Sequence, residues 1–228
     1  MFVGPTLGDR RDIVLSAGFQ VRPPARRGDV AALAGAEPGV LVLVDGLFDQ
    51  SLAVGHAELR EAITAGWKVF GLGSMGAVRA CEMRHHGMIG FGRVYEHFLA
   101  DEDFQDDEVA LLHTPAPDYR SVSEPLVHLR HFLRCLDESH RLSGVAAQRI
   151  ADELKAVWYG HRTLEFAASL VDQFSGGDAA AAAHSWLNDF DRFRVKGQDL
   201  TDFLRHTVWL RDSVESRPQA APYSRTAL

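Results

Sequence analysis

A continuous run of apolar residues, GVLVLVDG (Gly39 to Gly46), constrains the fold of this chain more than any other feature. A strand with one face in water alternates apolar and polar residues, whereas a strand buried on both faces is apolar throughout. A second short apolar run, WKVFG, follows further along, and each run leads into a segment of helical periodicity. The pattern predicts a parallel α/β layer in which the strands at Phe2, Leu41 and Val69 are adjacent.

The character of the chain changes near residue 120. From Ser121 onward the segments have helical periodicity, and the last residues have none. We therefore expect an α/β core over 1–118, a helical region over 119–212 that packs as a separate layer or lid, and a flexible tail over 213–228. Within the core, DEVALLH (107–113) is a further strand candidate. The acidic run DEDFQDDE (101–108) is expected to be a solvated loop, with a cation site as the alternative.

Charge and composition narrow the classes of function. The formal net charge of −7 disfavours nucleic acid as the main partner, because phosphate binding requires a basic face. No apolar run is long enough for a membrane span, and the first residues do not resemble a signal peptide. The chain has two cysteines, Cys81 and Cys135, and no CxxC pair, which indicates a reducing cytoplasm. No histidine or cysteine cluster has the spacing of a metal site, so we expect neither a metal nor another cofactor.

The turn after the second apolar run, GLGSMGAVRACE, places Ser74 among glycines. Gly71, Gly73 and Gly76 form GxGxxG, the fingerprint of dinucleotide binding, between a strand and a helix. That fingerprint requires an acidic residue at the end of the next strand, and the sequence lacks one at that distance. A dinucleotide site is therefore disfavoured.

Two other interpretations of Ser74 stay open. Serine is a favoured helix N-cap, although the residue that would complete a capping box, at Ala77, is not Glu or Gln. Alternatively, Ser74 is a nucleophile at a strand-to-helix turn. The N–H groups of Met75, Gly76 and Ala77 would then face a developing oxyanion at the positive end of the helix.

Three further polar residues are candidates for the same site. Asp45 ends the first apolar run, where open α/β sheets place site residues, although it is equally placed to cap a turn. Thr6 follows Pro5 and either contributes a hydroxyl to the cleft or begins a turn. His56 lies on the predicted helix after the first strand, where it either orients a carboxylate or is structural.

Several sequence blocks, taken in order, resemble the TfuA-like family. They are GPTL (Gly4 to Leu7), RPP and RRGD (within 22–29), VDGLF (Val44 to Phe48), AVGHAEL (Ala53 to Leu59), GSMGAVRACEM (Gly73 to Met83), GMIGFGRVYE (Gly87 to Glu96) and DDEVALLH (Asp106 to His113). The resemblance implies a fold particular to that family. It also implies a YcaO enzyme as partner, which phosphorylates a backbone amide with ATP and replaces its oxygen with sulfur. Family members are implicated in hydrolysing a thiocarboxylated ThiS-like carrier protein, which supplies sulfide for thioamide formation on a ribosomal peptide or protein.

The resemblance also implies site residues. A Ser–Lys pair is associated with the hydrolysis, and Ser74 matches the serine. Lys196, in RVKGQDL, resembles a basic patch near the family's C-terminal end and is our candidate for the lysine. Ala57 stands where the family often has another lysine, which keeps open a non-catalytic role as an adapter between YcaO and its substrate. Arg79 is placed either to offset the charge of the anionic substrate or to pair with Glu82.

For the pair to act, Lys196 must be neutral. A lysine of ordinary pKa, about 10.4, is protonated at neutral pH and cannot accept the serine proton. We expect desolvation to lower the pKa of Lys196 so that it serves as general base.

Overall fold

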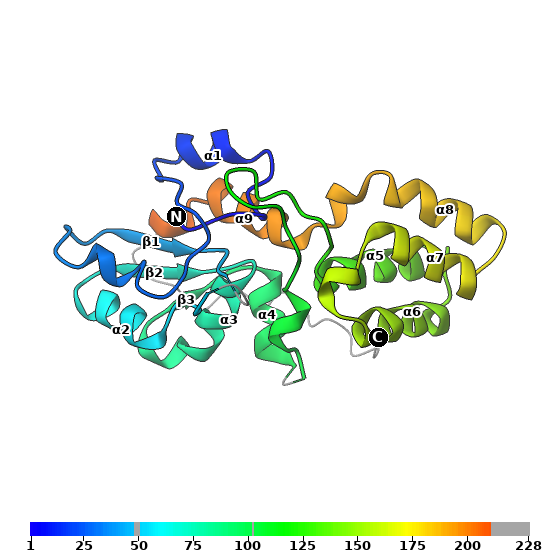
Figure 1. The fold of residues 1–228 in the computed structure, drawn as a ribbon, viewed down its shortest axis with the longest axis horizontal. Coiled ribbons are helices and arrows are strands. Elements are labelled where there is room, and N and C mark those ends of the chain that lie inside the picture. Colours follow the sequence, from blue (N-terminus) through cyan, green and yellow to red (C-terminus); the bar gives the residue numbers. More distant parts are fainter. Residues whose placement is uncertain (48–50, 102, 211–228) are drawn as a thin grey trace.

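The computed structural model describes residues 1–47, 51–101 and 103–210 (Figure 1). The predicted tail, 213–228, lies outside the described residues. In chain order the helices and strands are α1 (Arg11–Ser16), β1 (Val40–Leu43), α2 (His56–Thr64), β2 (Lys68–Gly71), α3 (Met75–Glu82), β3 (Ile89–Gly90), α4 (Arg93–Ala100), α5 (Leu126–Glu138), α6 (Gly144–Ala156), α7 (Leu164–Phe174), α8 (Asp178–Leu187) and α9 (Val195–Arg205).

The strands form a parallel sheet in the order β1-β2-β3. Leu41 is in register with Val69, and Phe2 forms a parallel bridge with Leu43 at the other side of β1. The predicted parallel α/β layer is therefore confirmed. Strand β3 was not expected. It contains only Ile89 and Gly90, and two residues are too few to show the apolar pattern of a strand.

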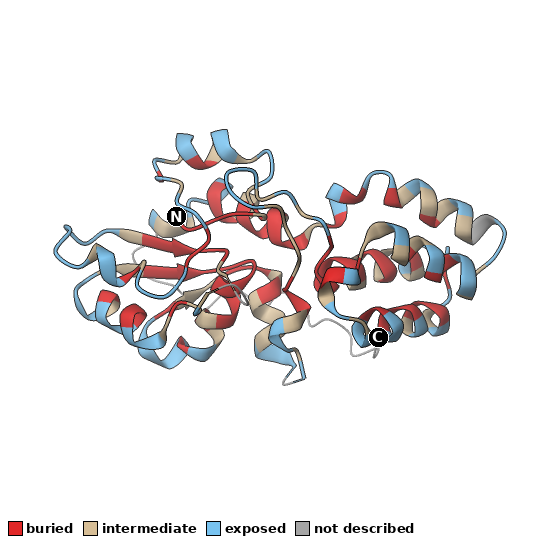
Figure 2. Cartoon of the chain, viewed as in Figure 1, coloured by how far each residue is buried: buried red, intermediate tan, exposed pale blue. Residues whose placement is uncertain are grey.

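Helices cover both faces of the sheet, as the apolar run in β1 requires (Figure 1). Leu41 and Leu43 point to the face covered by α2 and α3, whereas Val42 points to the face covered by α1 and α9. Successive side chains of a strand alternate between faces, so a strand between two helical layers is apolar at every position. Figure 2 shows this layer as a continuous buried band through the strands.

Helices α5 to α8 form a second core beside the sheet (Figures 1 and 2). Each helix packs against the next one in the chain, with α5 against α6, α6 against α7, and α7 against α8. Side chains such as Leu129, Phe132, Ile150 and Leu154 fill the space between them. The predicted helical C-terminal part is therefore confirmed for these four helices.

The last helix differs from the expectation that all helices after residue 121 form a separate layer. Helix α9 returns to the sheet, where Leu200, Phe203 and Leu204 pack against Val42 and Phe70. Burial of a large apolar side chain stabilises a fold by about 1.5–3 kcal/mol. Without α9 that face of the sheet would lose much of its apolar cover, which is the physical reason for its return.

The segment around residue 107 also differs from the expectation. Residues Asp106–Glu108 form a short 3-10 turn rather than a strand, and the segment after it makes a single bridge, His113 to Ser121. The acidic residues here are not simply solvated. Glu108 is buried and pairs with Arg130 at 3.0 Å, and Asp107 pairs with Arg162 at 2.8 Å. This segment is therefore held by ion pairs with the helical region and not by hydrogen bonds to a neighbouring strand of the sheet.

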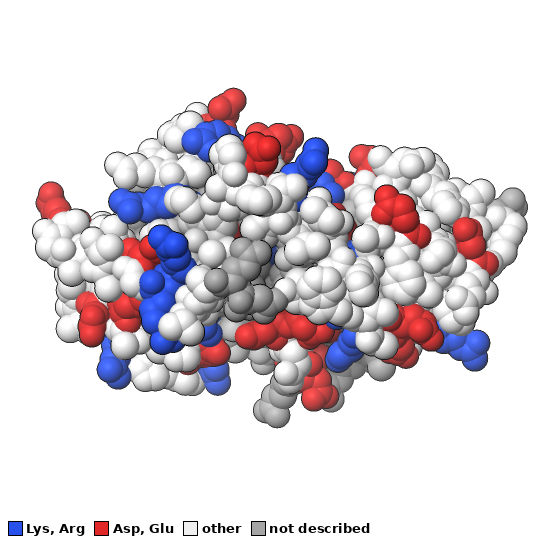
Figure 3. Space-filling view, in the orientation of Figure 1, with Lys and Arg blue, Asp and Glu red and all other residues white. Residues whose placement is uncertain are grey.

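Charges are dispersed over the surface. On the face seen in Figure 3, acidic and basic side chains are interspersed, with acidic groups gathered along the lower middle. None of the helices in the described ranges is both long and apolar enough to cross a membrane.

Candidate active site

Ser74 lies in the turn between β2 and α3, at the N-cap position of α3. Its N–H donates to the carbonyl oxygens of Val44 and Leu72, which ties the turn to the end of β1. The hydroxyl makes no capping hydrogen bond. Instead, its Oγ donates to the carbonyl oxygen of Val109 at 3.3 Å, and the residue is only 4 % exposed. Ser74 thus occupies the cap position while its hydroxyl points to another partner.

The glycines around Ser74 allow α3 to approach the sheet closely. A Cβ atom on Gly76 would lie 1.8 Å from the carbonyl oxygen of Leu43, and one on Gly71 would lie 2.1 Å from the carbonyl oxygen of Gly76. Gly73 has φ +73°, which glycine adopts readily. Helix–sheet packing and the turn itself therefore account for all three glycines of GxGxxG.

Lys196 lies in the first turn of α9, and its side chain extends to Ser74. Its Nζ donates to the carbonyl oxygen of Val109 at 3.1 Å and to Ser74 Oγ at 3.5 Å. The residue is 2 % exposed. Burial lowers the pKa of Lys196 from its usual value, although the negative charges of Asp45 and Glu124 oppose this fall. The neutral amine is therefore more populated than in an ordinary lysine.

The carbonyl group of Val109 joins the two side chains, because it accepts a hydrogen bond from each. Its position depends on the helical region. Arg130, on α5, holds the neighbouring Glu108 through two hydrogen bonds of 3.0 Å. Arg162 is buried and donates to the backbone carbonyl and the side chain of Asp107. The helical layer therefore holds in place one wall of a site whose serine belongs to the α/β layer.

Asp45 and Thr6 lie together beside this pair. Asp45 follows β1 and accepts hydrogen bonds from the N–H groups of Gly4 and Thr6 and from Thr6 Oγ1, at 2.7–2.9 Å. Both side chains are buried. Asp45 thereby anchors the N-terminal loop and places a negative charge near Lys196.

A cavity of about 60 Å³ opens onto Ser74, Lys196 and Asp45. The segment 109–113 forms one wall, and Pro5, Gly46, Leu47 and Tyr159 complete the lining. His113, in this wall, contacts the carbonyl oxygen of Thr114 through Nδ1 at 2.7 Å, so Nε2 is the ring nitrogen left for other contacts. Val109, His113 and Tyr159 were not expected as site residues. A backbone carbonyl such as that of Val109 leaves no mark in the sequence, although Val109 and His113 belong to DDEVALLH, one of the blocks on which the family resemblance rests.

The N–H groups at the start of α3 are only partly available. Gly76 donates to the carbonyl oxygen of Val44 at 3.1 Å, and Ala77 donates to that of Ser74 at 2.9 Å. Within the described part of the chain, the N–H of Met75 has no hydrogen-bond partner. Three N–H groups were expected to face an oxyanion. Because those of Gly76 and Ala77 already have acceptors, only that of Met75 remains available for this role among the three.

Two expected residues, His56 and Arg79, lie in a separate cluster away from the cavity. His56 Nε2 and Arg79 Nη1 both contact Glu82 Oε2, at 2.7 and 2.6 Å, and Arg79 Nε donates to the carbonyl oxygen of Val54. Arg79 therefore forms the ion pair with Glu82, one turn away, that was the alternative to a role in binding the substrate. The structure therefore brings Ser74, Lys196, Asp45 and Thr6 together, and it places His56 and Arg79 in a different cluster.

Metal ligation has no support among the described residues, where no group of three or more His, Cys, Asp or Glu side chains is arranged to hold an ion. His128, one of the histidines in the helical region, is bonded instead to Glu124.

Comparison with known proteins gives one family. A family model described as TfuA-like protein matches residues 45–163, which include Asp45, Ser74 and Val109 but not Lys196. No curated protein matches the chain. Since the family model covers more than half of the 228 residues, including the strand-to-helix turn that carries Ser74, the chain belongs to the TfuA-like family.

Proposed function

We propose that this protein hydrolyses the thiocarboxylated C-terminus of a ThiS-like carrier protein and so supplies sulfide to a YcaO enzyme. The TfuA-like family is associated with YcaO enzymes and thioamidation. The observation that carries the hydrolytic role is the buried contact between Lys196 Nζ and Ser74 Oγ at 3.5 Å, beside a cavity. Hydrogen bonds between catalytic groups are often this long in the absence of substrate.

The reaction begins with the proton of Ser74. Neutral Lys196 accepts this proton, and Oγ attacks the carbonyl carbon of the thiocarboxylate. Lys196 then returns the proton to sulfur as the carbon–sulfur bond breaks, so that hydrosulfide leaves and an acyl-serine remains. The N–H of Met75, at the N-terminus of α3, is our candidate donor to the oxyanion.

The second half of the reaction uses the same base. Lys196, neutral again, accepts a proton from water, and the water oxygen attacks the acyl carbon. The bond to Ser74 Oγ breaks, and Lys196 returns the proton to that oxygen. Thiocarboxylate and water are consumed, and carboxylate, hydrosulfide and one proton are produced.

A cavity of about 60 Å³ adjoins the pair. We propose that the chain end of the carrier, a Gly-Gly terminus without side chains, reaches Ser74 from this cavity. We place the reaction in the cytoplasm, since the free thiols of Cys81 and Cys135 suit a reducing compartment.

The decisive test is release of sulfide from a thiocarboxylated carrier by the purified protein. Ser74→Ala is expected to reduce the rate by about 10³-fold or more, because no nucleophile remains. The matched control is Ser169→Ala, which removes an exposed helical hydroxyl bonded to a backbone carbonyl and should leave the rate unchanged. Sulfide release by Ser74→Ala at the wild-type rate would refute the assignment of Ser74 as the nucleophile.

A second role, as an adapter between a YcaO enzyme and its substrate, is favoured by Trp158. Trp158 is 52 % exposed, and the next residue, Tyr159, lines the cavity. Exposed tryptophan is characteristic of sites where proteins bind one another. Loss of YcaO binding in Trp158→Ala, with sulfide release intact, would support this role, whereas unchanged binding would contradict it.

A further inference from the structure

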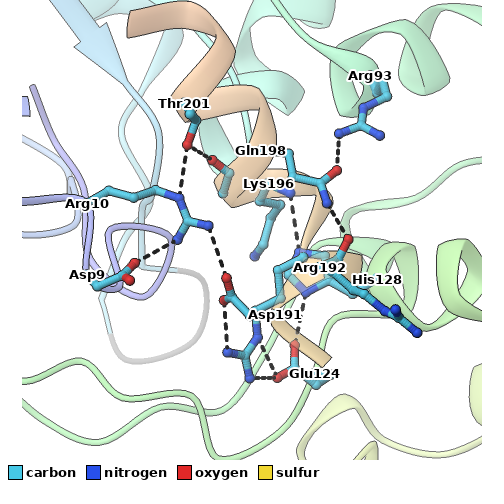
Figure 4. Close-up of polar contacts among 12 residues, drawn as sticks. Asp9, Arg10, Arg93, Glu124, His128, Asp191, Arg192, Lys196, Gln198 and Thr201 are labelled. Carbon is cyan, nitrogen blue, oxygen red and sulfur yellow. Dashed lines mark hydrogen bonds and ion pairs between the residues drawn. The ribbon is translucent and has the colours of Figure 1, made fainter. Parts of the chain in front are cut away.

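The backbone N–H of Lys196 is held by a residue from a distant part of the chain. The first N–H groups of any helix lack intrahelical acceptors, and they must find others when they are buried. Lys196 is the second residue of α9, and its N–H donates to Nε2 of His128 at 3.4 Å (Figure 4). His128 belongs to α5, so a side chain of the helical layer caps the helix that carries Lys196.

A carboxylate fixes the orientation of His128. Nδ1 of His128 lies 2.9 Å from Oε2 of Glu124, and both side chains are buried. Burial lowers the pKa of His128 to about 4, against the opposing effect of Glu124, so the ring is neutral at physiological pH. A neutral ring that donates from Nδ1 can accept at Nε2, as the bond to Lys196 requires.

The same carboxylate also holds the residue before α9. Arg194 donates to Oε1 of Glu124 from Nε at 3.1 Å and from Nη2 at 2.5 Å. Burial raises the pKa of Glu124, but hydrogen bonds and charge from His128 and Arg194 outweigh burial and keep this pKa below its usual value. Glu124 is therefore an anion that holds the start of α9 at two points, directly at Arg194 and through His128 at Lys196.

We propose that Glu124 and His128 are positioning residues for the Ser74–Lys196 pair: by capping the first turn of α9 they set where the Lys196 amine lies relative to Ser74. This proposal rests on the proposed function only for its kinetic consequence. In this arrangement two layers of the molecule meet at Lys196. Ser74 belongs to the α/β layer, whereas His128, which caps α9, belongs to α5 of the helical layer.

Glu124 also acts on Lys196 through its charge. Its carboxylate and that of Asp45 raise the pKa of Lys196 against the effect of burial. The other charged or titratable groups at the start of α9 include neutral His128, the Arg194 guanidinium and Arg10, whose guanidinium packs on Gly197. Asp191 pairs with both arginines, at 3.4 Å from each. Replacing the Glu124 carboxylate by an amide should therefore lower the pKa of Lys196 further.

The titration of Lys196 can be followed directly by NMR of the full-length protein labelled with ¹³C,¹⁵N-lysine. The sequence contains only two other lysines, Lys68 and Lys155, so the spectrum is simple. In Glu124→Gln we expect the Lys196 midpoint to fall by about one pH unit, a tenfold change in the protonation equilibrium, while those of Lys68 and Lys155 stay unchanged. An unchanged Lys196 midpoint in a folded variant would overturn the electrostatic part of the proposal.

Asp199→Asn is the matched control, because Asp199 is also buried and also anchors α9, through the N–H of Val94. This variant should leave the Lys196 midpoint in place. An equal shift in Asp199→Asn and Glu124→Gln would mean that any loosening of α9 moves Lys196, and it would contradict a specific role for Glu124.

The positioning role is tested by kinetics at His128. His128→Phe keeps the ring shape but removes the acceptor, and we expect kcat to fall roughly 10- to 100-fold with KM unchanged. His128→Gln places an amide oxygen near the former Nε2 and should recover most of the rate. Equal kcat values in Phe, Gln and wild-type proteins would refute the positioning role. The NMR result does not depend on turnover, so a failure of the proposed hydrolysis is distinguishable from a failure of this proposal.

Discussion

Lys196 carries its amine into a space from which water is nearly excluded. Desolvation disfavours the protonated form, which helps a general base and harms stability at neutral pH. Because the folded-state pKa is lowered, the folded protein binds fewer protons than the unfolded chain between the two pKa values. Stability therefore rises with pH through that window, and it is lost as pH falls through the folded-state pKa.

Replacement of Lys196 by methionine should separate catalysis from stability. We expect Lys196→Met to release sulfide about 10²- to 10⁴-fold more slowly than the wild type, because no base remains. Its melting temperature at pH 7 should exceed that of the wild type, and this difference should shrink towards pH 11, above the ordinary lysine pKa of about 10.4, where the lysine is largely neutral in both states. Calorimetry at the two pH values measures the effect, and a gap that widens with pH would contradict it.

Arginine at the same position gives a complementary prediction. The guanidinium group stays protonated at all accessible pH values, so Lys196→Arg should lack activity. Its buried charge should also lower the melting temperature below that of Lys196→Met. Activity of Lys196→Arg within tenfold of the wild type would exclude Lys196 as the base.

At the scale of elements, the contact between α3 and β1 positions Ser74. Gly76 lies where the helix crosses the strand, and a Cβ atom there would overlap the backbone of Leu43. Backbone cannot move aside as a side chain can, so the helix would have to shift and carry Ser74 with it.

Gly76→Ala is therefore expected to destabilise the protein by about 3 kcal/mol or more, as other overpacking changes do. Gly176→Ala is the control, since among the described residues nothing lies within 4 Å of its added methyl group and its φ is not positive. The control should change stability by about 0.5 kcal/mol or less. Denaturant unfolding of both variants measures the difference, and similar midpoints would show that α3 is not closely packed.

The contact between α9 and α4 depends on pH through Asp199. Its Oδ2 accepts from the N–H of Val94, and its Oδ1 lies 3.5 Å from Arg93 Nε. Burial raises the pKa of Asp199 to about 6, although hydrogen bonds and charge from Val94 and Arg93 oppose the rise. The folded state therefore binds more protons than the unfolded state below that pH.

We predict that the stabilisation from protonated Asp199 is present at pH 4 and is lost as pH rises through about 6. The free energy of unfolding of the wild type relative to Asp199→Asn should fall by on the order of 2–3 kcal/mol between pH 4 and pH 7. Urea unfolding at several pH values tests this slope. A difference independent of pH would mean that Asp199 is ionised throughout.

At the scale of the molecule, the chain leaves the α/β layer after α4, builds α5 to α8, and returns with α9 to the sheet (Figure 1). We propose that 1–118 is the core of the family fold and that 119–212 is the helical region. The return of α9 makes the two parts depend on each other. Without it, Val42 and Phe70 lose their cover.

A fragment of residues 1–118 should accordingly fail to fold alone. It lacks Leu200, Phe203 and Leu204, which bury one face of the sheet, and it lacks the arginines that hold Asp107 and Glu108. We expect aggregation or a chain without cooperative unfolding, measured by circular dichroism and size-exclusion chromatography. A monomeric fragment with a sharp thermal transition would show that the core is autonomous.

The sequence by itself determined the features that rest on local pattern. The apolar runs before Asp45 and Gly71 predicted β1 and β2, because a strand buried on both faces has no polar position. Small residues around Ser74 predicted a tight strand-to-helix turn, because only glycine permits that approach. The choice of Lys196 came from family resemblance, and its catalytic role stays a prediction.

Only the tertiary structure decided what depends on contacts between distant parts of the chain. The run 107–113 has the composition of a strand, yet Arg130 and Arg162 hold its acidic residues, and its Val109 carbonyl contacts Ser74 and Lys196. Nothing in the sequence distinguishes His128 from the other histidines, whereas in the structure α5 places it against the start of α9. Arg79 and His56 had the right residue types, but Glu82 binds both, outside the cavity lining. Local pattern fixes which face of an element is buried, whereas the partner on that face is chosen by burial and ion pairing across the whole chain.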